Sequence, residues 1–394
     1  MRCIRLSLTQ FKKISIFLAA NVLNVVLALY RLFRPVPRGI YFCYNQCIHQ
    51  IHHTLYIAIE LSRCQNKYPV FVLSTSSEAS FIINEELSKA WNNVRFHEVR
   101  HPGYDRRDFS INWFILLCRL RMFKPAAVVV TDYFDNVFRK LLVKTFWVYT
   151  SHGLANRQFS FDPHIKDYDL VILPGARDSG AFDDRLGPLR NSVVAGYSKL
   201  DYFRYHQGEQ PLKLFTDKNP VILYNPHFDP AFSSFFEKGP ELLAALSESL
   251  KFNIIFMPHP DLARRFPGLI TPLRSLPRVF VADRPKINLE YMAISDLYIT
   301  DISSSAYEWL YFRKPIVFFN PKAIERGSSW HYSAWDCGPV VKSSEDVLAA
   351  VKDELARPER FRQVREGMLK EIFYNQDRLV SADIARIILE RLKA

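Results

Sequence analysis

Three short polar motifs each follow an apolar run in the middle and later parts of this 394-residue sequence. They are Ser151-His152-Gly153, Met257-Pro258-His259-Pro260 and Thr300-Asp301-Ile302-Ser303-Ser304-Ser305. Imidazole can accept or donate a proton near neutral pH, and hydroxyls beside a helix N-terminus suit phosphate oxygens. Strands that run into such residues are typical of α/β enzymes that handle phosphate-bearing groups.

The serine-rich turn is the strongest of the three signals. An apolar strand is predicted to end at Thr300, and a helix is predicted to begin within Ser303–Ser305, because serine is a favoured N-cap. Free backbone N–H groups and hydroxyls would then form a diphosphate site. Plain capping is the alternative, but three serines exceed what a cap requires. The residues predicted to bind the diphosphate are Thr300, Asp301, Ser303, Ser304 and Ser305.

Both histidine motifs follow predicted strands. Two prolines fix the backbone around His259, which could donate to a phosphate oxygen or protonate a leaving group, and Pro260 is assigned to the same site. His152 precedes a glycine that permits a sharp turn, and its neutral imidazole could deprotonate an attacking hydroxyl. A structural role is the alternative for each histidine, but loops at strand ends commonly carry chemistry.

Two further positions are weaker candidates. His227, in Asn225-Pro226-His227-Phe228, could face the same site or serve the structure. Gly196 opens the segment Gly196-Tyr197-Ser198-Lys199-Leu200-Asp201 and could contact the nucleotide or support a hinge. Asp201 at the end of that segment is expected to cap a helix.

Metal and cofactor chemistry receive little support. His49, His52 and His53 lie near a predicted helix start, but no acidic partner is evident, so binding of an acceptor is favoured over binding of zinc. The sequence has no G-x-G-x-x-G, P-loop or H-E-x-x-H motif, which argues against dehydrogenases, ATPases and zinc proteases. We therefore expect no metal and no cofactor.

Composition indicates anionic partners. The formal net charge is +12, and no zinc-finger, RNA-binding or long basic motif accompanies it, so nucleic acid is not expected as a partner. A phosphorylated substrate and a membrane surface remain. The six cysteines lack regular spacing, which is typical of reduced cytosolic thiols.

An apolar segment near the N-terminus suggests membrane contact. Residues 14–33 are about as long as a spanning helix requires, but Asn21 and Asn24 interrupt them. Basic residues mark the far end of the segment at Arg31, Arg34 and Arg38. The segment could be a single anchor, a helix in the bilayer interface, or a buried helix. In both membrane interpretations the basic flank places the enzyme body on the cytoplasmic face.

An alternation of short apolar strands and longer helical stretches predicts two parallel α/β domains. The expected divisions are a membrane-associated segment 1–38, an N-terminal Rossmann-like domain 39–204, a linker 205–220 and a C-terminal Rossmann-like domain 221–394 that includes the last helices. Predicted strands of the first domain are 39–44, 70–73, 94–98, 126–131, 146–149, 170–173 and 192–195. Those of the second are 221–224, 253–257, 279–282, 297–300, 316–319 and 340–341.

The motifs and their order resemble the CDP-glycerol glycerophosphotransferases of teichoic-acid synthesis. The resemblance extends over roughly residues 145–350, and its specific part is the Thr-Asp-x-Ser-Ser block with a following Lys-Pro. The matching positions are His152-Gly153, Gly196–Asp201, Pro258-His259-Pro260, Asp296, Thr300-Asp301, Ser303-Ser304, Lys314-Pro315-Ile316 and Gly338–Val341.

This resemblance implies a GT-B fold, a CDP-glycerol or CDP-ribitol donor, a membrane-bound lipid-linked acceptor and no obligatory metal. It implies that His152 is the base and that His259, Ser303 and Ser304 contact the diphosphate. Ile302 and Met257 depart from the family pattern, which usually has Tyr and Arg at these positions. A GT-B glycosyltransferase that uses a nucleotide sugar is therefore the alternative, and a non-catalytic membrane-associated scaffold is a third possibility.

Overall fold

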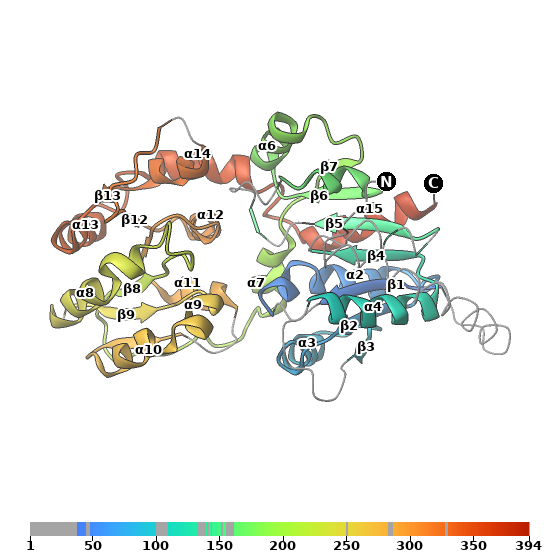
Figure 1. Cartoon of the computed structure of the whole chain (residues 1–394), viewed down its shortest axis with the longest axis horizontal. Helices are drawn as coiled ribbons and strands as arrows, with labels where there is room; N and C mark the ends of the chain where they lie inside the picture. The colour runs from blue at the N-terminus through green and yellow to red at the C-terminus, as the bar shows by residue number, and fades with distance from the viewer. Residues whose placement is uncertain are drawn as a thin grey trace, which may run out of the picture. The chain divides into compact units, whose positions relative to one another are not determined.

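Figure 1 shows the computed structural model of the chain. It describes residues 38–44, 48–99, 109–131, 139, 142, 144–150, 153–154, 161–249, 251–282, 287–327 and 330–393. His152 and the segment 14–33 lie outside these ranges. Within them, no helix is both long enough and apolar enough to cross a bilayer.

The chain divides into two compact units. The first unit comprises residues up to 152, residues 161–207 and residues 373–394, and the second comprises residues 153–160 and 208–372. The change from the first unit to the second falls between Gln207 and Gly208, inside the predicted linker. Tyr205 still packs in the first unit, where its hydroxyl donates to Glu60.

Counted over the described residues, the first unit has a seven-stranded sheet of order β3-β2-β1-β4-β5-β6-β7. All of its strand pairings are parallel. Its strands are β1 (Ile40–Tyr44), β2 (Val70–Ser74), β3 (Arg95–Glu98), β4 (Ala127–Val130), β5 (Phe146–Thr150), β6 (Leu170–Leu173) and β7 (Ser192–Val194). Apolar runs such as β4 are buried throughout, as expected for a parallel sheet covered on both faces.

Helices connect these strands. The 3-10 helices are η1 (Ile48–His53), η3 (Pro163–Asp167) and η4 (Ser198–Asp201). The α-helices are α2 (Leu55–Cys64), α3 (Ser77–Ser88), α4 (Phe109–Phe123), α6 (Ala176–Leu186), α7 (Tyr202–Tyr205) and α15 (Val380–Lys393). The helix expected to start near His49, His52 and His53 begins at Leu55, because η1 occupies the preceding turns.

The sheet of the second unit is also parallel throughout. In the part of the chain that is described it has six strands, in the order β10-β9-β8-β11-β12-β13. They are β8 (Val221–Tyr224), β9 (Asn253–Phe256), β10 (Val279–Val281), β11 (Leu297–Thr300), β12 (Ile316–Phe319) and β13 (Val340–Val341).

The helices of the second unit follow the same alternation. They are α8 (Ser234–Glu248), α9 (Pro260–Arg265), α10 (Pro267–Ile270), η5 (Thr271–Ser275), α11 (Asn288–Ile294), α12 (Ser305–Trp309), η6 (Leu310–Phe312), η7 (Trp330–Cys337), α13 (Ser344–Ala356) and α14 (Arg362–Ile372). The predicted class of two parallel α/β units is confirmed, and each predicted strand is present to within one residue at either end.

The position of the last helix corrects the predicted domain boundaries. Residues 221–394 were expected to form one domain, but residues 373–394 belong to the first unit. Figure 1 shows α15, in red, within the blue-to-green unit, and α15 contacts α2. Val380, Ile384 and Ile388 of α15 are buried in the core of the first unit. The helix joins that core because its apolar face has a partner there.

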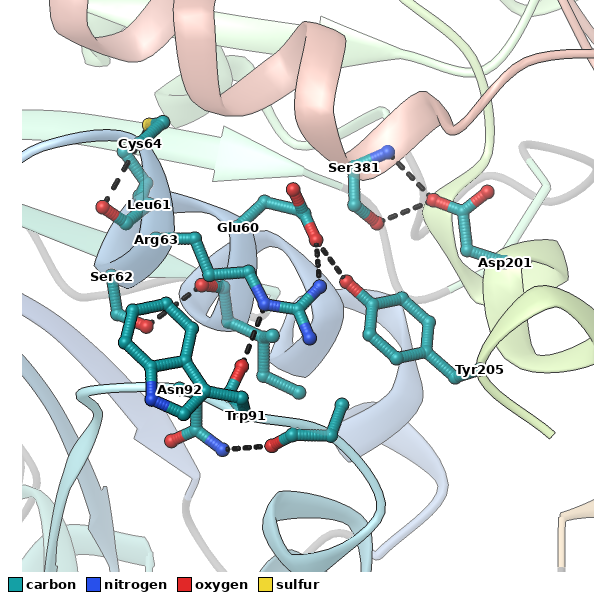
Figure 2. Close-up of polar contacts among 12 residues, drawn as sticks. Glu60, Leu61, Ser62, Arg63, Cys64, Trp91, Asn92, Asp201, Tyr205 and Ser381 are labelled. Atoms are coloured by element: carbon teal, nitrogen blue, oxygen red, sulfur yellow. Dashed lines mark hydrogen bonds and ion pairs between the residues drawn. The ribbon is translucent and has the colours of Figure 1, made fainter.

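A buried carboxylate fixes the start of α15. Asp201 accepts hydrogen bonds from the Ser381 N–H at 2.6 Å, the Ser381 hydroxyl at 2.5 Å and the Val380 N–H at 3.2 Å. Figure 2 shows the Asp201–Ser381 contacts. The expected capping function of Asp201 is confirmed, although the capped helix lies about 180 residues further along the chain.

This cap predicts a pH dependence of stability. Burial raises the pKa of Asp201 to about 6, against an ordinary value of 3.8, although the Ser381 and Val380 donors oppose that change. A raised pKa in the folded state gives stability that is present below pH 4 and lost as the pH rises through about 6. Since one pKa unit corresponds to about 1.4 kcal/mol, the loss is on the order of 3 kcal/mol.

Asp201→Asn should therefore remove this fall in the free energy of unfolding between about pH 4 and pH 6. Urea unfolding of both proteins across this pH range measures the effect. Parallel pH profiles for the wild type and the variant would contradict the assignment to Asp201.

Candidate functional site at the carboxyl edge of the second sheet

Three loops with the predicted chemistry meet at one edge of the second sheet. Strands β9, β8 and β11 are neighbours and run in parallel, so the segments after Phe256, Tyr224 and Thr300 leave the sheet at the same carboxyl edge. Ligands of open α/β sheets bind at this edge. The histidines of the Pro-His motifs and the serine-rich turn are therefore positioned by adjacent strands.

Asn225 joins the three loops. Its side-chain amide donates to the Met257 carbonyl at 2.6 Å, and its side-chain oxygen accepts from the Tyr298 hydroxyl at 2.8 Å and the Ser305 hydroxyl at 2.9 Å. Its backbone carbonyl accepts from the Thr300 hydroxyl at 2.8 Å. Because Asn225 is buried, loss of its side chain would leave several polar groups unsatisfied.

His227 and His259 have the same local geometry. Nδ1 of His227 accepts from the Asp229 N–H at 2.9 Å, and Nδ1 of His259 accepts from the Asp261 N–H at 3.1 Å. Since Nδ1 is an acceptor in both rings, the proton of each neutral ring is on Nε2, which becomes a hydrogen-bond donor. The Phe228 ring lies 4.4 Å from the His227 ring and 4.5 Å from the His259 ring, centroid to centroid, and so connects them.

The Asp301 carboxylate is a buried anchor. It accepts from the His227 N–H at 2.9 Å, the Ser234 N–H at 2.7 Å and the Ser234 hydroxyl at 2.9 Å. It also accepts from the N–H of Ile302. Burial raises the pKa of Asp301, while the N–H groups of Ser234, Ile302 and His227 oppose that change. Asp301 is 3% exposed, so it holds the first turn of α8 and the His227 loop in place.

The serine-rich turn differs in one respect from the prediction. Helix α12 begins at Ser305 with Ser304 as its N-cap, as expected, but several of its first amides are already hydrogen-bonded. The Ser305 N–H donates to the Ser303 hydroxyl, and the N–H groups of Ala306 and Tyr307 donate to the carbonyls of Ser303 and Ser304. The prediction that the first helix amides are free is therefore wrong for Ser305, Ala306 and Tyr307. The chain forms a tight turn here, in which backbone N–H groups bond to carbonyls three residues earlier.

The Ser304 hydroxyl is the open polar group of this turn. The hydroxyls of Ser303 and Ser305 are 2.7 Å apart and bond each other, whereas no described residue hydrogen-bonds the Ser304 hydroxyl. Gly153, from the first motif, is close to it: a Cβ on Gly153 would lie 3.6 Å from the Ser304 Oγ. The residue after His152 therefore lies next to the serine-rich turn.

The remaining predicted residues are distributed as follows. Pro260 is the exposed first residue of α9, and Thr300 is fully buried beneath the turn. Gly196 belongs to the first unit and has a φ of +109°; a Cβ there would lie 2.7 Å from the Tyr374 carbonyl oxygen. Packing therefore requires glycine at 196, and Gly196 is not part of the contacts at this edge.

Two of the histidines near the first helix, His52 and His53, belong to the core of the first unit. His52 and His53 are 5% and 3% exposed. The acidic partner not evident from sequence is Glu86: its carboxylate lies 3.3 Å from His52 Nε2 and 3.4 Å from His206 Nε2. Burial would raise the pKa of Glu86, but His206 and His52 hold it below its usual range. Burial disfavours the expected acceptor-binding role for His52 and His53, and no described cluster of His, Cys, Asp and Glu is arranged to hold a metal.

Sequence reasoning did not assign functions to Asn225 and Phe228. A signal was present, because Asn225-Pro226-His227 repeats the order of a strand, a proline and a histidine seen at Phe256-Met257-Pro258-His259. Lys314, part of the family pattern, donates to the carbonyls of Ala293 and Ser295 at 2.8 and 2.6 Å, so it fixes the end of α11.

The two parallel α/β units define a fold of the GT-B type. In a structural comparison, the "Structure of the Wall Teichoic Acid Polymerase TagF" matches with a TM-score of 0.66 and 14% identity, over 98% of each chain. UDP-GlcNAc 2-epimerase from Neisseria meningitidis, bound to UDP-GlcNAc, matches with a TM-score of 0.62 and 14% identity, over 90% of this chain and 99% of that one. At such identities these matches show the fold alone.

Residues 118–390 match the model of one sequence family, and the chain belongs to that family: CDP-Glycerol:Poly(glycerophosphate) glycerophosphotransferase. The resemblance inferred from the motifs is thereby confirmed. Teichoic acid poly(glycerol phosphate) polymerases of Bacillus subtilis (strain 168) and Bacillus spizizenii are 25% and 24% identical, over 49% and 50% of this chain. These stretches span 28% and 54% of the two relatives, so the chain matches only part of each.

Proposed function

We propose that this protein transfers glycerol phosphate, or ribitol phosphate, from a CDP-alditol to a hydroxyl of a lipid-linked acceptor in cell-surface polymer synthesis. The reaction releases CMP. Family membership supports this proposal, as does the similarity to teichoic acid polymerases. One matching TagF structure is a variant soaked with CDPG.

One observation carries the assignment of the donor site. At the carboxyl edge of the second sheet, two histidines whose Nδ1 atoms accept backbone N–H groups, and a serine hydroxyl, lie on loops that follow neighbouring strands. Hydrogen bonds of Asn225 and Asp301 hold these loops together. Donors fixed by a second set of hydrogen bonds suit a diphosphate, because they need no reorganisation when charge develops on the leaving phosphate. The second unit would bind the donor, and the first unit would bind the acceptor.

In the proposed reaction, the acceptor oxygen attacks the phosphorus that carries the alditol. A new P–O bond forms to the acceptor, the P–O bond to CMP breaks, and the acceptor proton passes to His152, acting as the base. His259, His227 and Ser304 would donate to the diphosphate oxygens and stabilise the departing CMP. Alignment of the nucleophile with the leaving group supplies a further part of the rate enhancement.

We further propose peripheral association with the cytoplasmic face of the membrane. The net charge of +12 favours an anionic surface, and residues 14–33 provide an apolar segment with basic flanks. A lipid-linked acceptor would be reached from that surface.

A donor panel tests the proposed activity. Release of the nucleotide is measured with CDP-glycerol, CDP-ribitol, UDP-sugars and CMP-sugars, using a lipid-linked glycerol phosphate primer as acceptor. We expect CMP release from a CDP-alditol, and we expect His152→Ala to abolish it without altering thermal unfolding. Turnover confined to a nucleotide sugar would instead establish the glycosyltransferase alternative, which Met257 and Ile302 keep open.

A further inference from the structure

The amino edge of the first sheet carries a basic residue in front of every strand. Because its seven strands are parallel, their amino ends lie at one edge, opposite the carboxyl edge. A lysine or arginine stands at the first position of a strand or up to four residues before it. In sheet order these residues are Arg95, Lys67, Arg38, Lys124, Lys144, Lys166 and Arg190. We call these seven residues the basic edge.

The cations of the basic edge are exposed and are not neutralised by the fold. All seven are exposed, and none forms an ion pair with another described residue. The nearby carboxylates are engaged elsewhere: Asp167 pairs with Arg139 and His164, and Asp169 accepts the Trp147 N–H at 2.7 Å. The positive charge of the edge is therefore available to a partner.

The second sheet provides an internal comparison. At its amino edge Arg278 pairs with Asp217, Asp296 accepts the Val221 N–H, and Lys314 is occupied by two carbonyls. Lys218 and Lys251 remain exposed there, before β8 and β9. A full row of unpaired cations is thus not a general property of how this chain builds parallel sheets.

The dimensions of the basic edge suit a flat anionic surface. Seven strands spaced about 4.8 Å apart place these charges along roughly 29 Å. Trp91, in the connection from α3 to β3, lies at the same edge with 68% of its surface exposed. A cavity of about 430 Å³ before β6 and β7 is lined by Lys166 and Arg190 together with Tyr168 and Asn191. An exposed tryptophan among cations is typical of proteins at the bilayer interface.

Chain connectivity places this edge near the apolar N-terminal segment. That segment ends at Phe33, and β1 begins at Ile40, so six residues separate them. The seven Cα–Cα steps from Phe33 to Ile40 reach at most about 25 Å when fully extended. If residues 14–33 contact a bilayer, the amino end of β1 must lie within that reach of the surface.

We propose that the basic edge docks the first unit on anionic phospholipid headgroups, with Trp91 entering the interface. This proposal rests on the membrane-bound acceptor of the proposed function and specifies the surface that meets the membrane. Lipid is favoured over nucleic acid because the cations form a line beside an apolar segment and an exposed tryptophan. Each lysine near an anionic bilayer strengthens binding about fivefold.

Cosedimentation of the full chain with vesicles tests the proposal. The vesicles contain phosphatidylcholine with phosphatidylglycerol, or phosphatidylcholine alone. The test variant is Lys144→Glu with Lys166→Glu, before the adjacent strands β5 and β6. The matched control is Lys218→Glu with Lys251→Glu, before the adjacent strands β8 and β9, which changes the net charge by the same amount. Thermal unfolding verifies that both variants fold, and Lys144→Gln with Lys166→Gln provides a milder pair.

We expect the test variant to bind anionic vesicles at least about tenfold more weakly than wild type, with the control within about twofold. Trp91→Ala should also weaken binding. Equal losses of vesicle binding in both double variants, or no loss in the test variant, would overturn the proposal. A test variant that loses binding to nucleic acid but keeps binding to vesicles would overturn it as well. The vesicle assay contains no nucleotide donor and measures binding alone. Failure of the donor panel and failure of vesicle binding can therefore be told apart.

Discussion

His259→Ala is expected to lower CMP release from CDP-glycerol by about 10²–10³-fold, the loss typical for one preorganised donor to a developing oxyanion. The bond from the Asp261 N–H to Nδ1 places the ring proton on Nε2, and contact with Phe228 holds the ring. In the proposed donor complex, both features would direct one N–H group of the ring to the diphosphate. The expected loss is in kcat, because the hydrogen bond strengthens as charge develops on the departing phosphate.

His259→Asn separates catalysis from stability. His259 is also the N-cap of α9, and asparagine is a favoured N-cap that can still accept the Asp261 N–H. The alanine variant should lose about 1 kcal/mol of stability together with activity, whereas the asparagine variant should lose activity alone. Steady-state kinetics and thermal unfolding measure the two effects. Wild-type kcat in His259→Asn would show that His259 only caps the helix.

Asp301→Ala should destabilise the second unit on the order of 3–5 kcal/mol and abolish donor binding. The substitution leaves the His227 N–H, the Ser234 N–H and the Ser234 hydroxyl without their acceptor in a buried site. The loops of His227 and the serine-rich turn would then separate. Asp301 is a positioning residue, since its carboxylate faces these protein donors.

Asp201→Ala is the matched control, because Asp201 caps α15 through the N–H and hydroxyl of Ser381 just as Asp301 caps α8 through Ser234. Both variants should unfold at lower temperature. CDP-glycerol should raise the unfolding temperature of Asp201→Ala but not that of Asp301→Ala. Both variants are measured under conditions in which they are folded before heating. A retained shift in Asp301→Ala, or its loss in both variants, would contradict the assignment of this edge as the donor site.

Much of the fold is readable from local patterns. Each strand is a short run of apolar, often β-branched residues between polar turns, so runs such as Leu297–Thr300 and Leu170–Leu173 are predictable to the residue. Because a helical stretch separates each strand from the next, the strands are expected to form parallel sheets. Residues that follow the strands then lie at a common edge of each sheet. The motifs after those strands also indicated the family, which the family match confirms.

Pairings between distant segments were not predictable in the same way. Asp201 meets Ser381 across 180 positions, Asp301 meets Ser234 across 67, and Glu86 meets His52 across 34. No local periodicity encodes such partners. The same limit explains why α15 was assigned to the wrong unit, since its amphipathic pattern shows that one face is buried but not against which core.

The sequence by itself determined the strands, the parallel class, the family and the residues available for chemistry, because these follow from local composition and order. The tertiary structure decided which of those residues hold the fold and which remain open. Asp301 became an anchor and Ser304 an open hydroxyl because burial and hydrogen-bond partners are set by the packing of whole elements.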